Sequence, residues 1–282
     1  MNKTLKKILL VLAVIYAILI MMGIFDYIPP NFYKLHQANF SQALPPSADH
    51  LLGTDWWKKD VFTEFVYGAK STFYSGMLAG IPFLIFGILL GVGSAYQANR
   101  TSYYLDKLLE ILNSFPKLIV LLIIIGLFGN HMVMLMMIFG IISAPKLAEL
   151  IKGKVLALRK EAFVDSSIAL GLSHAQIIFK HILYYNCRHI IIGQFFFIYA
   201  AAILVEASLS YVNLGFSQTS ASWGYMLSEA RSEPKTLFTW PWDSDFNLKA
   251  FVVISSLTLL TLSMVYLAEW LKNRDHLLKG IE

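Results

Sequence analysis

The chain has 282 residues, of which 57% are hydrophobic and 15% are charged, and its mean hydropathy is +0.60. One soluble core of this length cannot hide that much apolar surface, so the composition excludes an ordinary soluble domain and predicts an all-α membrane protein. A net charge of +5 follows from basic residues near the membrane and does not indicate a nucleic-acid partner.

Six apolar runs are long enough to cross a membrane as helices, since a hydrocarbon core of about 30 Å takes roughly 20 helical residues. The predicted transmembrane helices cover residues 8–25, 71–96, 106–128, 131–149, 189–213 and 250–270. No small-x-small cleavage site follows the first run, so we expect an uncleaved anchor.

The positions of the basic residues predict the orientation of the chain. They gather before the first run, after the fourth run and at the end of the chain: Lys3, Lys6, Lys7, Lys152, Lys154, Arg159, Lys160, Lys180, Arg188, Lys272, Arg274 and Lys279. Basic loops stay on the cytoplasmic side, so both termini are predicted to be cytoplasmic.

Two longer segments, 26–70 and 214–249, are then extracytoplasmic. Both have tryptophans at their edges: Trp56, Trp57, Trp223, Trp240 and Trp242. We interpret them as anchors at headgroup depth in preference to ligand-stacking residues, because an indole combines an apolar body with a hydrogen-bonding tip.

Small residues form a stripe in the second run, at Gly76, Gly80, Gly87 and Gly91. Close helix packing is favoured over a substrate groove as their role. Three prolines also lie within predicted helices, at Pro82, Pro116 and Pro145, and each is expected to kink or open its helix.

Glu206 is an ionisable residue late in an apolar run. Such a carboxylate must face protein or water, so it either lines a transport pathway or is solvated or capped by Ser208 and Ser210 near the outer surface. The sequence favours neither interpretation.

Enzymatic motifs are missing. There is no G-x-S-x-G, H-E-x-x-H or Gly-rich dinucleotide loop, and GAKST at 68–72 lacks the glycines of a P-loop. No histidine or cysteine set has metal-ligand spacing. We therefore expect no catalytic residue, cofactor or metal in this chain.

The cytoplasmic loop has a pattern of its own. Residues 161–170 predict a short helix, Gly171 permits a left-handed turn, and Ser173 with Gln176 predicts a capping box that starts a second short helix, AQIIFKHIL. A solvated loop has no need of an apolar helical face, so this rigid protrusion is predicted to contact a partner subunit.

The motif Asp165-Ser166-Ser167-x-x-x-Gly171 resembles the EAA-x-x-x-G loop in membrane subunits of binding-protein-dependent ATP-binding-cassette importers. Further segments resemble, in order along most of the chain, the second permease of the dipeptide/oligopeptide/nickel family: HLLGTDWWKKDVFTEFVYGAKSTFYSG at 50–76, Phe115-Pro116, APKLAELIKGKVLAL at 144–158 and ILVEASLSYVNLGF with SWGYML at 203–227.

This resemblance implies a type I importer permease bundle in the bacterial cell membrane, with an anchor helix and extracytoplasmic segment at 1–70 and a permease core at 71–282 whose coupling loop lies near 150–188. The implied partners are a sister permease in a heterodimer, two cytoplasmic ATPase subunits that use ATP and Mg²⁺, and an extracytoplasmic solute-binding protein. Peptides or similar small solutes are the implied substrates. The residues implied to contact the ATPase are Asp165, Ser166, Ser167, Ala169, Leu170, Gly171 and Ser173.

The chain departs from the family pattern at four places, one of which is the terminal segment LAEWLKNRDHLLKG, which differs from the family's usual ending. Asp165-Ser166-Ser167 replaces Glu-Ala-Ala, Tyr184 stands where a proline usually ends the loop, and Lys58-Lys59 replaces Gly-Arg. Two alternatives remain open: a nickel or metal-chelate importer, and a membrane scaffold or sensor that no longer transports. A secondary transporter is disfavoured, because we find one intramembrane carboxylate candidate and no relay.

Overall fold

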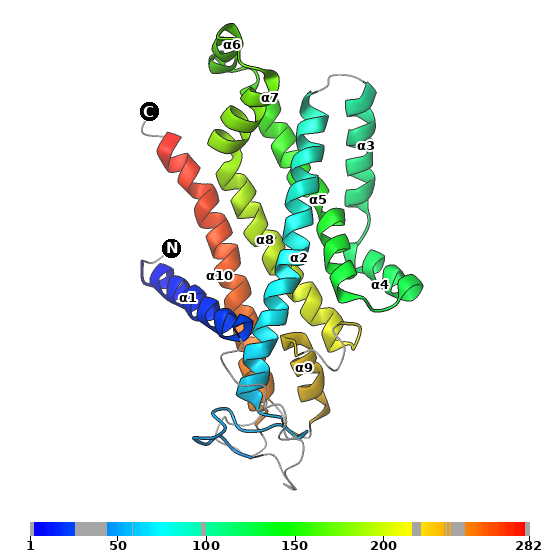
Figure 1. Ribbon diagram of the computed structural model, residues 1–282, viewed down its shortest axis with the longest axis vertical. Coiled ribbons are helices and arrows are strands. Elements are labelled where there is room, and N and C mark those ends of the chain that lie inside the picture. The colour runs from blue at the N-terminus through cyan, green and yellow to red at the C-terminus, as the bar shows by residue number, and fades with distance from the viewer. Residues whose placement is uncertain are drawn as a thin grey trace. The chain divides into compact units, whose positions relative to one another are not determined.

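The computed structural model describes residues 3–25, 44–57, 59–96, 100–215, 221–233, 235, 237 and 246–279. These residues are helical apart from the irregular segment before α2, the connections between helices and one Thr54–Asp60 bridge (Figure 1). Lys58, Trp240 and Trp242 lie outside the described residues, as do the side chains of Lys3, Lys6, Lys7, Lys272, Arg274 and Lys279. The helices are α1 (Lys3–Ile24), α2 (Val61–Tyr96), α3 (Arg100–Ser114), α4 (Lys117–Phe128), α5 (Met132–Leu158), α6 (Ala162–Ala169), α7 (His174–Gln176), the π-helix η2 (Ile177–Cys187), α8 (Arg188–Tyr211), α9 (Trp223–Ser232) and α10 (Leu248–Lys279).

Four helical segments of the described chain are long and apolar enough to cross a membrane: Val61–Ala95, Met132–Leu158, His174–Tyr211 and Leu248–Leu271. A fifth candidate is a bent pair, Ser102–Ser114 with Lys117–Phe128, if the pair counts as one span. Within the described part of α1, Val14–Ile24 is an apolar helix that is too short to count as a candidate span. The described chain thus has four or five candidate spans by length and composition.

The predicted helix 106–128 is interrupted at Phe115-Pro116, where α3 and α4 meet at 83°. Proline has no N–H to donate and disfavours helical backbone at the preceding residue, which explains the break. The kink predicted at Pro116 is therefore confirmed. Pro82 and Pro145, in contrast, lie inside helices α2 and α5, which continue through them.

Two compact units make up the chain, and each is described separately. The first contains residues 1–76, 128–132 and 203–264, and the second contains residues 77–127, 133–202 and 265–282.

Trp223 forms the centre of the first unit. Its side chain is 1% exposed, stacks on Phe65 with ring centroids 5.0 Å apart, and donates from Nε1 to the Phe65 carbonyl at 2.8 Å. A Cβ at Gly68 would lie 2.7 Å from the Trp223 ring, so the missing side chain lets α2 approach the indole. Trp223 is therefore a core residue, and our interpretation of it as a headgroup anchor is wrong, whereas Trp56 is 54% exposed.

In the second unit, glycines of α2 lie at close contacts with neighbouring helices. A Cβ at Gly80 would lie 2.5 Å from the Phe195 ring, and one at Gly87 would lie 2.7 Å from Leu147 Cδ2. A Cβ at Gly91 would lie 2.8 Å from a backbone atom, the carbonyl oxygen of Ala148. Larger residues would push α5 and α8 away from α2. Gly76, at the edge of the first unit, is buried.

Candidate functional site

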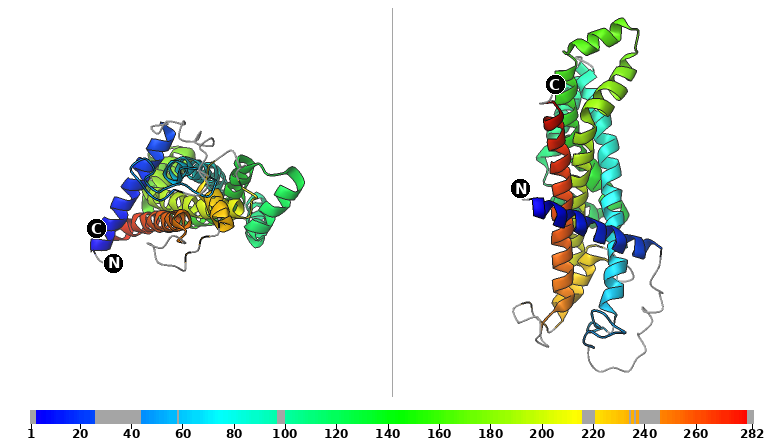
Figure 2. Two further views of the ribbon diagram at one scale, coloured as in Figure 1. Left: turned by 90° about the horizontal axis from the view of Figure 1, so that it is seen from below. Right: turned by 90° about the vertical axis from the view of Figure 1, so that its left-hand side faces the viewer.

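The candidate coupling loop lies in the second unit, where α6 and the start of α7 form a tip (Figure 2). At the C-terminal end of α6, the Leu170 N–H donates to the Ser166 carbonyl at 3.0 Å and the Gly171 N–H donates to the Ile168 carbonyl at 2.9 Å. Gly171 has a φ of +81°, in the left-handed region that costs other residues free energy. No atom lies within 4 Å of a Cβ built at Gly171, so backbone conformation alone explains the need for glycine.

A capping box starts the next helix as predicted. The Gln176 N–H donates to Ser173 Oγ at 3.3 Å, and the Ser173 N–H donates to Gln176 Oε1 at 2.9 Å. The second helix is not short, however, because α7 runs through η2 into α8 as one helical segment, His174–Tyr211. The turn after α6 is therefore attached to one long, continuous helical segment.

Most of the predicted contact residues lie on the surface of this tip. Those that are exposed are Asp165, Ser166, Ala169, Leu170, Gly171 and Ser173. Leu170 is 81% exposed, and Ile168 beside it is 47% exposed. Ser167 is buried instead and donates to the Phe163 carbonyl at 2.7 Å, so its side chain supports α6 from inside.

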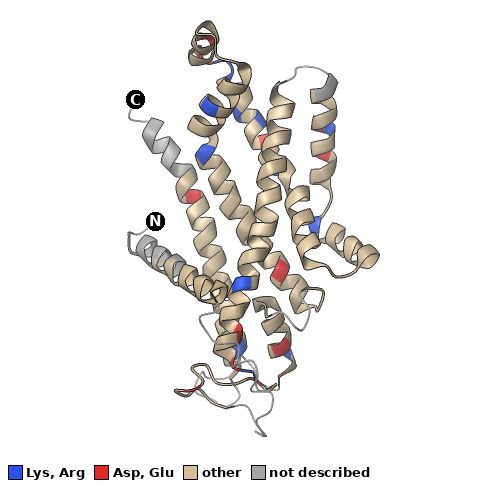
Figure 3. Ribbon diagram, viewed as in Figure 1, with Lys and Arg blue, Asp and Glu red and all other residues tan. Residues whose placement is uncertain are grey.

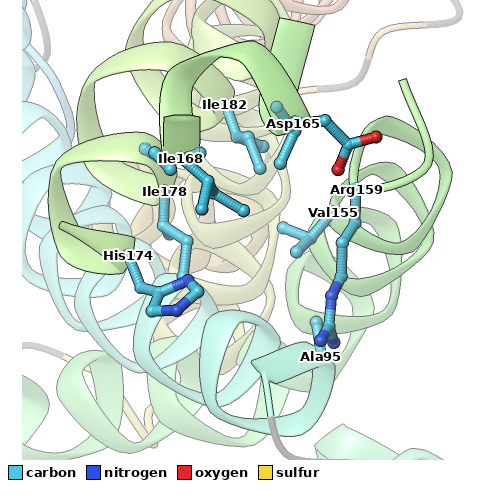
Figure 4. A pocket seen from close by; sticks show the side chains of 10 residues that line it. Ala95, Val155, Arg159, Asp165, Ile168, His174, Ile178 and Ile182 are labelled. Atoms are coloured by element: carbon cyan, nitrogen blue, oxygen red, sulfur yellow. The ribbon is translucent and has the colours of Figure 1, made fainter. Parts of the chain in front are cut away.

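A pocket of about 410 Å³ lies under α6 (Figure 4). Its walls are aliphatic, with three polar side chains among them: Ala95, Val155, Arg159, Val164, Asp165, Ile168, His174, Ile177, Ile178 and Ile182. The tip therefore combines a hollow apolar face with exposed apolar side chains on its outer surface, as expected of a surface that another protein covers.

Glu206 lies on α8 in the first unit and is completely buried, with 0% exposure. Ser210 Oγ donates to Glu206 Oε1 at 2.7 Å. Ser208 is exposed and donates to the Leu204 carbonyl, so it does not cap the carboxyl. Glu206 is thus surrounded by protein and not by outer solvent.

A buried ion cluster in the first unit was not predicted. Lys249 Nζ, at the start of α10, lies 2.8 Å from Asp55 Oδ2, 2.8 Å from Glu64 Oε2 and 2.7 Å from Glu229 Oε2. Lys59 Nζ lies 2.6 Å from Glu229 Oε1. The partners are up to 194 residues apart in the chain, so no local spacing could reveal them.

Three carboxylates and two ammonium groups share this cluster. Burial raises the pKa of Glu229, but Lys249 and Lys59 outweigh it and leave that pKa below its usual value. Burial likewise lowers the pKa of Lys59, yet Glu64 and Glu229 raise it by more, so its net shift is upward. Both groups are held in their charged forms.

The carboxylate oxygens of Asp55, Glu64 and Glu229 lie within 4.8 Å of one another, close enough to share a metal ion. The Lys249 ammonium is already in ion-pair distance of all three. It supplies the positive charge that a bound metal ion would otherwise provide to these carboxylates. The cluster is thus an internal salt bridge that joins the segment 44–60 to α2, α9 and α10.

Long apolar helices, some with buried charges, together with a capped hairpin at one tip, define an all-helical, multi-pass membrane protein. Residues 84–274 match the family of binding-protein-dependent transport system inner membrane components, and the chain belongs to that family.

Three relatives illustrate the family. The chain is similar to the dipeptide transport system permease protein of Alkalihalophilus pseudofirmus, with 33% identity over 66% of this chain and 61% of the relative. It is similar to the oligopeptide transport system permease protein of Bacillus subtilis, with 29% identity over 84% of this chain and 76% of the relative. The glutathione transport system permease protein of Pectobacterium atrosepticum is 27% identical over 67% of this chain and 62% of its own length. The chain spans about three fifths of the length of several of the relatives that it matches.

Proposed function

We propose that this chain is a permease subunit of an ATP-driven importer that moves peptides or similar small solutes across the bacterial cell membrane. The observation that carries the proposal is the hairpin of α6, Gly171 and the Ser173 capping box in a chain of this family. Names of relatives that transport dipeptides, oligopeptides and glutathione support peptides as the solute class.

The chain is proposed to contribute the pathway and no catalysis. Two separate cytoplasmic ATPase subunits would hydrolyse ATP with Mg²⁺, a sister permease would complete a heterodimer, and an extracytoplasmic binding protein would deliver the solute. The exposed apolar side chain of Leu170 supports a protein partner at the tip, since it gains by leaving water.

Six crossings are part of the proposal. The four long spans and the bent α3–α4 pair give up to five candidate segments, and we assign the sixth crossing to α1, whose apolar helix Val14–Ile24 is shorter. With basic residues around the tip, this count is consistent with both termini and α6 on the cytoplasmic side.

Coupling is proposed to work by differential binding. ATP would close the paired ATPases, α6 would move with the groove that holds it, and the bundle would open outward. Hydrolysis would then return it to the inward state. A ligand shifts such an equilibrium only by its difference in affinity for the two states, so the contact at α6 must be rigid. Support for rigidity comes from the Gly171 turn and the capping box, which leave this corner little conformational freedom.

The test is purification of a tagged copy from its own membranes in mild detergent, with mass spectrometry of the associated proteins and small molecules. We expect two ATPase chains, a related permease and a solute-binding protein, and the bound ligand would identify the solute class. Recovery of the chain alone, in a preparation that keeps another importer intact, would contradict the proposed function and favour a scaffold.

A further inference from the structure

Polar side chains of α3 and α5 form a ladder in the second unit. Asp106 pairs with Lys152, and Asn113 Nδ2 donates to Glu149 Oε1 at 2.6 Å. The residue number rises on α3 as it falls on α5, so the two helices run antiparallel where these pairs lie. Figure 3 marks acidic and basic positions on α3 and a basic one at the start of α4.

The next rung of the ladder holds two cations. Lys117 begins α4 directly after the break at Pro116, and Lys146 lies on α5 three residues before Glu149. The Asn113–Glu149 contact lies four residues before Lys117 and three residues after Lys146, so the two ammonium groups belong to the same part of the second unit and repel each other. Among the described residues, neither ammonium lies within ion-pair distance of a carboxylate.

Both lysines are accessible from outside this chain. Lys146 is exposed and Lys117 is half-buried. Lys146 Nζ lies 4.5 Å from the centroid of the Phe197 ring, and this aromatic face holds the ammonium without neutralising it. The rung therefore presents two uncompensated positive charges beside an aromatic ring.

Lipid tails cannot be the neighbour of this rung. Lys146 lies about 21 Å from the start of α5 and about 18 Å from its end, counting 1.5 Å per residue. Since α5 is a candidate span, its centre is at hydrocarbon depth, where charged side chains face protein or a water-filled cavity. Lipid phosphates lie at the membrane surface and are too far away to serve as the counter-ion. A mobile anion that crosses the membrane fits this position.

We propose that Lys117 and Lys146 form a binding site for a carboxylate of the solute on its way through the membrane. This site rests on the proposed function, because a peptide carries a carboxylate at its C-terminus and often in its side chains. Two ammonium groups bind a carboxylate by charge-assisted hydrogen bonds, and their mutual repulsion is relieved when the anion arrives. The exposed carboxylate of Glu149, one helical turn further on, would repel a misplaced anion.

Protection from chemical labelling tests the site without requiring transport. Opened membrane vesicles containing the full complex would be treated with an amine-acetylating reagent, alone, with N-acetyl-trialanine or with its C-terminal amide, and the lysines would be quantified by mass spectrometry. At twice its Kd, the free acid should lower labelling of both lysines about threefold. The amide should not. Lys107, an exposed lysine paired with Glu110 at 2.7 Å, is the matched control and should label equally throughout.

Equal labelling with the acid and the amide would overturn the site. Low labelling even without peptide would also overturn it, because the lysines would then be covered by a carboxylate of another subunit.

Transport selectivity gives a second readout. In proteoliposomes, K117Q/K146Q should reduce uptake of trialanine about tenfold relative to uptake of its amide, while K117R/K146R and K107Q should keep the wild-type preference. Uptake of Ala-Glu-Ala amide, which has a side-chain carboxylate but no C-terminal one, shows whether a side-chain carboxylate can occupy the site. If K117Q/K146Q lowered uptake of the acid and the amide equally, the site would be contradicted.

If the wild-type complex imported none of these peptides, the peptide-importer proposal would fail, and the labelling result would still decide the site.

Discussion

Among single residues, Gly171 and Glu206 are constrained by the structure in two different ways. Gly171 is selected by backbone conformation, because its φ of +81° is strained for any other side chain and there is open space around it. Glu206 is constrained by its surroundings, because its completely buried carboxyl accepts from the Ser210 hydroxyl and also has the Ser222 side chain beside it.

Gly171→Val is expected to abolish coupling while leaving membrane insertion unchanged. A β-branched side chain at positive φ costs on the order of 1–3 kcal/mol, which would distort the turn between α6 and α7. The measurement is ATP-dependent uptake together with ATP hydrolysis in the reconstituted complex. Gly153→Ala is the control, since Gly153 is helical with nothing within 4 Å of its Cβ position. Full uptake by the Gly171 variant would remove the coupling role.

Glu206→Gln is expected to keep both the fold and uptake, because the amide oxygen can still accept the Ser210 hydrogen bond. Glu206→Ala should instead lower the free energy of unfolding by about 1–3 kcal/mol, the cost of leaving a buried polar partner unsatisfied. Thermal unfolding in detergent and uptake would be compared with Ser208→Ala, whose hydroxyl is exposed. A loss of uptake in the Gln variant with unchanged stability would place Glu206 on the pathway.

At the scale of elements, the Lys249 cluster connects four segments of the first unit through one ammonium group. Breaking a buried ion pair on one side costs more than the pair contributes, because the remaining charges stay desolvated. The cluster is thus a place where one substitution loosens several elements together.

Lys249→Met is expected to lower the free energy of unfolding by roughly 3–5 kcal/mol, since three buried carboxylates lose their central cation. Adding Glu64→Gln to this variant should recover part of the loss by removing one of the stranded charges. Thermal unfolding is the measurement, and Lys107→Met, in an exposed pair, should change little. If the double variant were less stable than Lys249→Met, the electrostatic explanation would be wrong.

Acid should weaken the same cluster. The pKa of Glu229 lies below its usual value of 4.5 because Lys249 and Lys59 outweigh the effect of burial, so its contribution to stability is complete above about pH 4.5 and is lost as the pH falls through the lowered pKa. Between pH 7 and pH 3.5, the unfolding temperature of the wild type should therefore fall further than that of Glu229→Gln. An equal fall in both proteins would show that Glu229 does not contribute.

For the whole molecule, the proposed topology makes a direct prediction. The one cysteine, Cys187, is buried with 0% exposure, so introduced cysteines can be labelled against a low background. Lys160→Cys, beside α6, should react with a membrane-impermeant maleimide only in inverted vesicles, and Ala48→Cys, in the exposed outer segment, only in intact cells. Labelling of both from the same side would exclude an odd number of spans between them.

Local features of the fold were predictable from the sequence. The turn at Gly171 and the capping box at Ser173 depend on residues within a few positions of each other, and the break at Phe115-Pro116 depends on the proline itself. The apolar spans follow from composition over about twenty residues. These features need no knowledge of distant contacts, which is why the predicted hairpin lies where the structure has it.

The tertiary structure alone decided what the charged side chains do. Lys249 meets Asp55 across 194 residues, and Asn113 meets Glu149 across 36. Trp223 became a core residue because it stacks on Phe65, at a distance of 158 residues. The predicted spans were assigned from average hydropathy, so the isolated charges of Lys117 and Lys146 drew no attention until the structure showed the Asn113–Glu149 contact between their helices. Electrostatic energy depends on distances in space, which the order of residues does not contain.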